Sequence, residues 1–348
     1  MVRTISRGTP LTRYILILNA SSDHGECMSI DQPLPFWRRA GTFLWDSVRE
    51  DCGYPATLMK LIKSPVKLNS PIKETAKGIG AGAVVRWHEF GSLIYERGIY
   101  RDKLNGWTHC RTYGRYGSTS IECAPLLRVG SEMQIERWRC DIQQVDGFAA
   151  SKSELKEFAT MDDMVEKNSP EMIDEISPEK LAKNLAWDEI RIISHVDHDY
   201  FATWAWDGRV FLMNSGGSHH FAAAKYIAAR LEQPVELTGT YKIYGLCEQA
   251  ITELRREYGM FVLSHEPDAW LGFNEAMARF KATYYWKTLP RPHNHQRCAI
   301  FLPLKEKRSA MVARILKENN FQDLGAYLAG LAAQSQAVIN MSLRRNDG

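Results

Sequence analysis

The alternation of hydrophobic and polar residues is clearest after residue 198. Residues 199–206 alternate large and small side chains, Asp207-Gly208 follows, and residues 209–214 resume an apolar run. Asp-Gly between two strand-like runs is a strong hairpin signal, because both turn positions then need a positive φ. A glycine loop, an alanine-rich helical stretch and a further apolar run follow at 215–218, 221–231 and 235–240. The pattern predicts the order strand, turn, strand, glycine loop, helix, strand.

Weaker patterns place elements in the rest of the chain. Apolar residues at spacings of three and four predict helices over 35–51, 246–258, 270–281, 308–319 and 323–335. Short strands are expected over 13–19, 283–288 and 298–302, and aromatic and polar residues alternate over 84–139 as in antiparallel strands. Cap-like patterns predict three short helices, starting at Ser151, Ser169 and Ser177; the first fits a capping box and is expected to end near residue 166.

These patterns predict a mixed α+β fold with two regions. At 348 residues and 45% hydrophobic, the chain is long enough for two domains. We expect an N-terminal helix plus a β-rich region over residues 1–150. Residues 151–348 are expected to form an α/β domain with a helical extension at its C-terminal end.

Charge and cysteine content narrow the class of protein. The net charge of +3 is too small to predict a strong general attraction to nucleic acid. The seven cysteines are widely spread and form no C-x-x-C pair, so neither a disulfide framework nor a zinc ribbon is expected. No redox cofactor is expected either. No segment offers the roughly 18 uninterrupted apolar residues of a membrane span. We therefore expect a cytoplasmic protein that does not contact a membrane.

The glycine loop has the composition of an anion site. The start of a helix leaves four backbone N–H groups without helical partners and carries about half a positive charge. Gly216 and Gly217 would let an anion approach closely, and Asn214 and Ser218 offer polar side chains. These four residues are therefore the predicted contacts to a phosphate-bearing ligand such as a nucleotide.

Two histidines follow the loop directly. His219 and His220 can donate to an anion or exchange protons with it, so both are candidate catalytic residues. A structural alternative accounts for the same residues: Ser218 acts only as a helix N-cap, Gly216-Gly217 as a tight turn, and both histidines as solvated surface. Local chemistry does not separate these readings.

The run over residues 210–237, V-F-L-M-N-S-G-G-S-H-H-F-A-A-A-K-Y-I-A-A-R-L-E-Q-P-V-E-L, resembles the signature of the ParB/sulfiredoxin superfamily. In that signature a strand leads into G-x-H-R or G-x-x-R, followed by an alanine-rich helix and a proline before the next strand. The resemblance implies a ParB/sulfiredoxin-like module that binds nucleotide phosphates at Gly217, Ser218, His219 and His220.

The chain departs from that signature at two positions. Ser218 stands where sulfiredoxins carry their catalytic cysteine, so sulfinic acid reduction is not expected. His220 stands where most members carry an arginine, and histidine lacks the bidentate fork that pairs with phosphate. ParB-type proteins carry a helix-turn-helix after this module, but residues 312–330 resemble one only weakly, so centromere binding and DNA partition are not expected either.

A second polar cluster precedes the hairpin, in His195-Val196-Asp197-His198-Asp199. Two imidazoles and two carboxylates suit a divalent metal or general acid–base work. Alternate residues of a strand point to opposite faces, so the whole cluster cannot bind one ion, and a polar strand edge is the alternative. We expect Asp197 and Asp199 to be catalytic or metal-binding residues, because the hairpin can bring them near the glycine loop.

The leading hypothesis is a protein that binds ATP or another NTP with Mg²⁺ and supports NTP hydrolysis or phosphoryl transfer. The first alternative is a nucleic-acid-binding protein, with or without nuclease activity, of a phage, plasmid or other mobile element. Arginines and aromatic residues, which together bind single-stranded nucleic acid, are grouped over residues 107–139 and would form its binding surface. The structural alternative is that they form a solvated face of an antiparallel sheet. They are Arg111, Arg115, Arg137, Arg139, Trp107, Tyr113, Tyr116 and Trp138. The second alternative is a non-enzymatic interaction protein.

Overall fold

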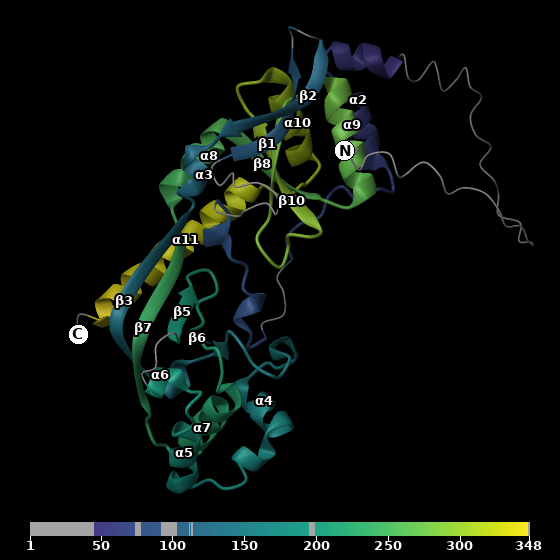
Figure 1. Ribbon diagram of the computed structural model, residues 1–348. Helices are drawn as coiled ribbons and strands as arrows, with labels where there is room; N and C mark the ends of the chain where they lie inside the picture. The colour runs from purple at the N-terminus through teal and green to yellow at the C-terminus, as the bar shows by residue number, and fades with distance from the viewer. Residues whose placement is uncertain are drawn as a thin grey trace, which may run out of the picture. The chain divides into compact units, whose positions relative to one another are not determined.

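The computed structural model shows a mixed α+β fold with two five-stranded sheets, as predicted (Figure 1). It describes residues 45–73, 78–91, 103–110, 112, 114–194 and 199–346. These residues belong to a single unit, 45–348. The predicted strand at 13–19 and most of the predicted helix at 35–51 lie outside the described residues, although residues 45–51 are helical.

The first sheet is entirely antiparallel, in the order β2-β1-β9-β10-β8. Its strands are β1 Lys103–Cys110, β2 Arg115–Glu122, β8 Tyr258–Ser264, β9 Tyr284–Thr288 and β10 Arg297–Pro303. Three helices pack into one apolar cluster with it: α2 Ala56–Lys63, α9 Pro267–Phe280 and α10 Lys307–Glu318. Three others pack into a second cluster: α3 Ala124–Leu127, α8 Glu248–Glu257 and α11 Leu324–Asn346. Both faces of the central strands are therefore buried.

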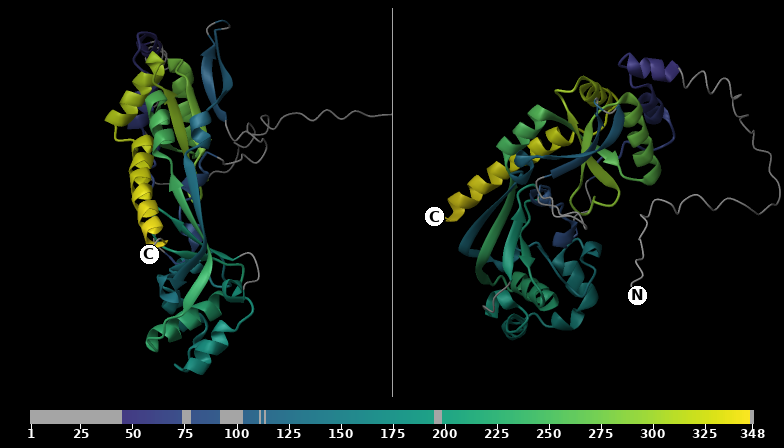
Figure 2. Two further views of the ribbon diagram at one scale, coloured as in Figure 1. Left: turned by 90° about the vertical axis from the view of Figure 1, so that its left-hand side faces the viewer. Right: turned by 45° about the horizontal axis from the view of Figure 1, so that its top comes forward.

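The second sheet has the order β3-β7-β5-β6-β4. Its strands are β3 Gly130–Asp141, β4 Gly147–Phe148, β5 Tyr200–Trp204, β6 Phe211–Met213 and β7 Glu236–Leu246. Figure 2 shows the long strands β3 and β7 side by side, and they pair antiparallel along most of their length. β5 runs parallel to β7, and β4 runs parallel to β6. The sheet is therefore mixed.

Three helices cover the second sheet around an apolar cluster: α4 Met161–Asn168, α5 Pro178–Leu185 and α7 Ser218–Arg230. The alanine-rich sequence of α7 buries Phe221, Ala222–Ala224, Ile227 and Ala228 almost completely. Small side chains let a helix approach its neighbours closely, and α7 contacts both α4 and α5. α7 is therefore held on several sides, and its first turn has a fixed position.

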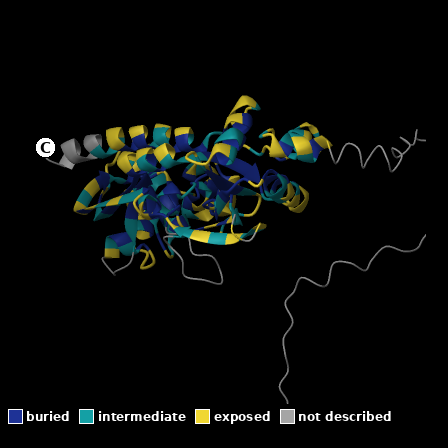
Figure 3. Ribbon diagram, turned by 90° about the horizontal axis from the view of Figure 1, so that it is seen from above, coloured by how far each residue is buried: buried dark blue, intermediate teal, exposed yellow. Residues whose placement is uncertain are grey.

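Both sheets combine strands from the two regions expected on either side of residue 150. β3 pairs with β7, and β1 pairs with β9. The expected β-rich character of residues 84–139 is confirmed by β1, β2 and most of β3. Buried residues accordingly run through the elements of both regions (Figure 3).

The predicted hairpin is confirmed, but its turn is not the expected one. β5 and β6 pair antiparallel, with Tyr200 opposite Met213. Gly208 has a φ of 80°, whereas Asp207 is not among the residues with positive φ. The N–H groups of Asp207 and Gly208 both donate to the Trp204 carbonyl, at 2.8 and 2.9 Å. The connection is therefore wider than a two-residue turn, and only its glycine needs the left-handed region.

The helix starts expected at Ser151 and Ser169 differ from the prediction. The one at Ser169 is a short 3₁₀ helix, Pro170–Met172, without a side-chain cap. The expected helix from Ser151 is a short 3₁₀ helix, Leu155–Glu157, followed by α4. The capping box lies at Thr160, whose hydroxyl accepts from the Asp163 N–H at 3.0 Å. The Asp163 carboxylate accepts in return from the Thr160 N–H at 3.0 Å, so an aspartate takes the place of the glutamate or glutamine of the usual capping box. The Ser177-Pro178 start is confirmed: Ser177 caps α5.

The strand β8 was not predicted, because its sequence lies between two expected helices. The helices and strands predicted after residue 245 are otherwise confirmed as α8, α9, β9, β10, α10 and α11. Of the helices within the described part of the chain, none combines the length and apolar character needed to cross a membrane.

Candidate functional site

Asn214 fixes the entry to the glycine loop. It lies directly after β6 and is 6% exposed. Its side-chain oxygen accepts from the N–H groups of Ala149 and Ala150, both at 3.2 Å. Its amide nitrogen donates to the carbonyls of Ala150 and Gly216, at 3.0 and 2.8 Å. The Asn214 side chain is thus occupied by the protein itself and holds the loop in place.

The two glycines allow a close approach of the chain to itself. Gly217 has a φ of 72°, and a Cβ there would lie 2.8 Å from the carbonyl carbon and oxygen of Glu189 and 2.9 Å from the Ile190 nitrogen. At Gly216 the nearest atoms to a Cβ belong to the Glu189 side chain, at 3.3 Å. On their Cβ sides, therefore, the glycines make room for residues 189–190.

Ser218 is the first residue of α7, and the N-cap position is held by Gly217. The alternative in which Ser218 serves as the N-cap is therefore wrong. The Ser218 hydroxyl is buried and donates to the Ser151 hydroxyl at 2.9 Å, and Ser151 Oγ in turn lies 3.9 Å from Met164 Sδ. Ser218 thus connects the start of α7 to residues before α4.

The backbone N–H groups of Ser218, His219 and His220 have no hydrogen-bond acceptor among the described residues. The first bond of the helix runs from the Phe221 N–H to the Gly217 carbonyl, at 2.9 Å. Three parallel donors and the positive end of the helix dipole therefore coincide at one place. This is the arrangement that binds anions at helix starts.

Both ring nitrogens of His219 are hydrogen-bonded to serines. Nε2 lies 3.0 Å from Ser153 Oγ, and Nδ1 contacts Ser169 Oγ. Asn168, the last residue of α4, donates to Ser153 Oγ at 2.7 Å. Burial lowers the pKa of His219, and Lys152 lowers it further, whereas Glu171 opposes them. The imidazole is therefore more completely neutral at pH 7 than that of a freely solvated histidine.

His220 is fixed by a different pair of residues. Its Nδ1 lies 3.0 Å from Asn184 Oδ1, and its ring stacks on Trp187 with 4.2 Å between centroids. The Asn184 amide nitrogen donates to the carbonyls of Met172 and Lys180, so its oxygen is left to accept from His220 Nδ1. The neutral ring then has its proton on Nδ1 and a lone pair on Nε2. Burial lowers the pKa of His220, and His219 adds to the shift.

Asp199 lies beside the loop, as predicted. Its Oδ1 accepts from the Ser215 N–H at 3.2 Å, and Arg191 donates to the Ser215 hydroxyl. Oδ2 is buried and has no hydrogen-bond partner in the described part of the chain, and burial raises the pKa of this carboxyl. Asp197 lies outside the described residues. Within the described ranges, no group of three or more His, Cys, Asp and Glu side chains is arranged to hold a metal ion.

The arginine and aromatic residues grouped in the sequence come from strands of two different sheets. Trp107, Arg115 and Tyr116 belong to the β1–β2 hairpin of the first sheet, whereas Arg137 to Arg139 belong to β3 of the second. Trp138 is stacked on Tyr241, with 4.1 Å between centroids. Arg111 and Tyr113 lie outside the described residues. The described residues of this group are therefore divided between two sheets, and a nucleic-acid surface formed by them stays a prediction.

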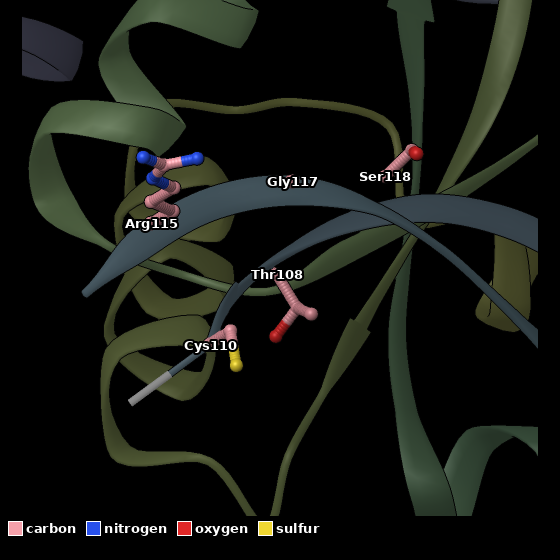
Figure 4. A pocket seen from close by; sticks show the side chains of 5 residues that line it. All are labelled: Thr108, Cys110, Arg115, Gly117 and Ser118. Carbon is pink, nitrogen blue, oxygen red and sulfur yellow. The ribbon is translucent and has the colours of Figure 1, made fainter. Parts of the chain in front are cut away.

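A separate hollow lies on the β1–β2 hairpin (Figure 4). Its lining consists of Thr108, Cys110, Arg115, Gly117 and Ser118. None of the predicted site residues belongs to it, and Figure 4 shows its side chains spread along the two strands without converging on one point. It is therefore an open surface hollow with no constellation of chemical groups.

Sequence reasoning missed most of the partners of the two histidines. These are Ser153, Asn168, Ser169, Asn184 and Trp187. Ser169 carried a signal, because Ser169-Pro170 resembles a helix start, but its side chain bonds His219 and caps no helix. The others carry no local signal, since their role depends on contacts between distant segments.

Comparison with known proteins places the chain in a family. No curated protein and no solved structure matches it. One family does match, over residues 135–341, which include part of β3, all of β4 to β10 and of α4 to α10, and most of α11. The matched range is more than half of the chain and contains every described residue of the site. The chain therefore belongs to the family described as a family of unknown function, DUF6685.

Proposed function

We propose that this protein binds a nucleotide, with its phosphate at the start of α7. The observation that carries the proposal is the set of N–H groups of Ser218, His219 and His220, which have no acceptor among the residues the structure describes. A phosphate oxygen can accept from several of them at once, and the helix dipole favours its charge. The resemblance of residues 210–237 to the ParB/sulfiredoxin signature motivates the same assignment.

Trp187 supplies a surface for the base of the nucleotide. One of its contacts is the His220 ring, yet 44% of the residue is exposed. Exposed tryptophan stacks well on nucleobases, because every base presents a π-face. The Glu189 carboxylate, 3.5 Å from Trp187 Nε1, is placed to accept from amino or hydroxyl groups of such a ligand. A base and a phosphate therefore have complementary groups on neighbouring residues.

Acidic and basic side chains both lie near the start of α7, where the phosphate would bind. Glu189 and Glu171 are acidic, whereas Lys152 and Arg191 are basic and lie close enough to influence His219 and Asp199. Asp199 is the one described carboxylate of the predicted pair, and Mg²⁺ commonly binds through one or two carboxylates together with phosphates and water. A requirement for Mg²⁺ remains a prediction of the same proposal, as does NTP hydrolysis or phosphoryl transfer.

Binding can be tested on the full chain by thermal shift and calorimetry with ATP, ADP, GTP and CTP, each with and without Mg²⁺. Adenosine serves as the phosphate-free control, and a short DNA duplex tests the nucleic-acid alternative. We expect a nucleotide to raise the Tm through mass action and adenosine to bind at least about tenfold more weakly. A shift by DNA alone that disappears with added salt would favour the alternative.

Variants connect the binding to the site. Trp187→Ala should weaken nucleotide binding about tenfold or more, because base stacking is worth about 1–3 kcal/mol. Trp107→Ala is the matched control, since Trp107 is 40% exposed on β1 of the other sheet. If no nucleotide binds, or if both variants bind equally well, the proposal is wrong.

A further inference from the structure

Ser153, His219 and Ser169 form a chain of side chains drawn from three separate segments. Ser153 precedes the 3₁₀ helix Leu155–Glu157, Ser169 follows α4, and His219 lies in the first turn of α7. The His219 ring joins the two hydroxyls through Nε2 and Nδ1. Ser169 is 2% exposed, whereas Ser153 is only half-buried. The order from solvent inward is therefore hydroxyl, imidazole, buried hydroxyl.

The hydrogen bonds indicate where the protons lie. Asn168 Nδ2 donates to Ser153 Oγ at 2.7 Å, so a lone pair of that oxygen is already used. Nε2 of His219 is then the acceptor for the Ser153 hydroxyl proton, at 3.0 Å. A neutral imidazole that accepts at Nε2 carries its proton on Nδ1 and donates it to Ser169 Oγ. The ring is thus held in one tautomer by a partner at each nitrogen.

A backbone hydrogen bond also holds Ser153 in position. Its backbone N–H donates to Ser151 Oγ at 3.1 Å, and Ser151 Oγ accepts from the Ser218 hydroxyl at 2.9 Å. The loop that carries Ser153 is therefore tied to the same helix turn that carries His219. A serine and a histidine held together in this way have the geometry of a nucleophile and its general base, with a third group that orients the base.

We propose that Ser153 is a nucleophile activated by His219, with Ser169 as a positioning residue, and that the chain hydrolyses carboxylic esters. In the first step Ser153 Oγ bonds to the ester carbonyl carbon, and its proton moves to His219 Nε2. The bond from that carbon to the leaving oxygen then breaks, and His219 Nε2 returns the proton to the departing alcohol. Water attacks the acyl-serine through the same base, releasing the acid and restoring the Ser153 hydroxyl.

The surroundings suit this chemistry. The N–H groups of Ser218 and His219 lie at the same helix start and have no acceptor among the described residues, so they are free to donate to an oxyanion. Burial keeps the His219 ring neutral at pH 7, as a base must be before it accepts a proton. The proposal does not rest on nucleotide binding, because none of its steps uses a bound phosphate.

The test is covalent labelling of the full chain with a fluorophosphonate, followed by peptide mass spectrometry. We expect one adduct, on Ser153, and turnover of a short-chain p-nitrophenyl ester. Ser153→Ala should abolish both, and His219→Gln should slow labelling about 100-fold or more, because it removes the base. Ser120→Ala and His295→Gln, which change an exposed serine on β2 and an exposed histidine, should label like the unmodified chain.

Ser169 is tested by a readout that a merely structural role would not change. Ser169→Ala should slow labelling and alter its pH profile, and Ser169→Thr should restore both, because threonine keeps the hydroxyl that accepts from Nδ1. Melting temperatures of all variants identify any loss of fold. The proposal is overturned if the unmodified chain carries no adduct on Ser153, or if folded His219→Gln is labelled as fast as the unmodified chain.

Discussion

The close approach of the glycine loop to residues 189–190 predicts a large cost for Gly217→Ala. The new Cβ would lie 2.8 Å from backbone atoms of Glu189, and backbone cannot rotate away as a flexible side chain does. The residue also keeps a φ of 72°, which costs an L-residue roughly 1–2 kcal/mol. Displacing the neighbouring chain adds about 1–3 kcal/mol, as overpacking does elsewhere. We expect the free energy of unfolding to fall by about 2–5 kcal/mol.

Gly208→Ala is the matched control for this change. Gly208 has a similar φ of 80°, but a Cβ there meets nothing within 4 Å. It should therefore lose only the conformational part, roughly 1–2 kcal/mol. Urea unfolding followed by tryptophan fluorescence measures both, provided that the two variants have the same m value. Equal losses would refute the argument that packing against Glu189 and Ile190 requires glycine at position 217.

Three further predictions concern stability. Burial lowers the pKa of His88 from 6.5 to about 4. The free energy of unfolding is therefore highest above pH 6.5 and falls by about 3 kcal/mol as the pH drops toward 4. His88→Phe should remove this pH dependence, which urea midpoints measured across the range would reveal. Asn214→Ala should cost about 2–4 kcal/mol in urea unfolding, because it removes the four hydrogen bonds by which the buried Asn214 side chain holds residues 149, 150 and 216, and Asn214→Leu should not recover the loss. Ser177→Ala should lower the free energy of unfolding by about 1 kcal/mol, and Ser177→Asp should recover it, because the hydroxyl caps the Lys180 N–H of α5; an unchanged Tm in Ser177→Ala would contradict this.

The fold is predictable from sequence where its patterns are local. The hairpin β5–β6 and helix α7 follow from contiguous periodicity and turn residues, and both are confirmed. Strand β8 behaves differently because both of its faces are buried. Met260 and Val262 face one apolar cluster, whereas Phe261 and Leu263 face the other. Burial on two sides removes the alternation by which a strand is recognised.

The site is predictable only in its position along the chain. The start of α7 was expected, and Asp199 does lie beside it. The partners of His219 are 66 and 50 residues away in sequence, at Ser153 and Ser169. Hydroxyl groups at such distances leave no spacing pattern, because the contact exists only once α4 and α7 have packed. The glycines illustrate the same limit: their sequence indicates clearance, but only the fold shows that Glu189 fills it.

The contacts of Ser218 and His220 show what these residues do at the two positions where the chain departs from the ParB/sulfiredoxin signature. At the cysteine position, Ser218 is buried and bonded to Ser151, so the group at that position is structural, and the more accessible hydroxyl is that of the half-buried Ser153. At the arginine position, the His220 ring stacks on Trp187, so in the proposed site the backbone N–H groups would contact the anion. The two proposals therefore share the N–H groups of Ser218 and His219, whereas the Trp187 ring serves only nucleotide binding and the Ser153 hydroxyl only the covalent reaction. A change at Trp187 should alter the first alone, and a change of the Ser153 hydroxyl the second alone.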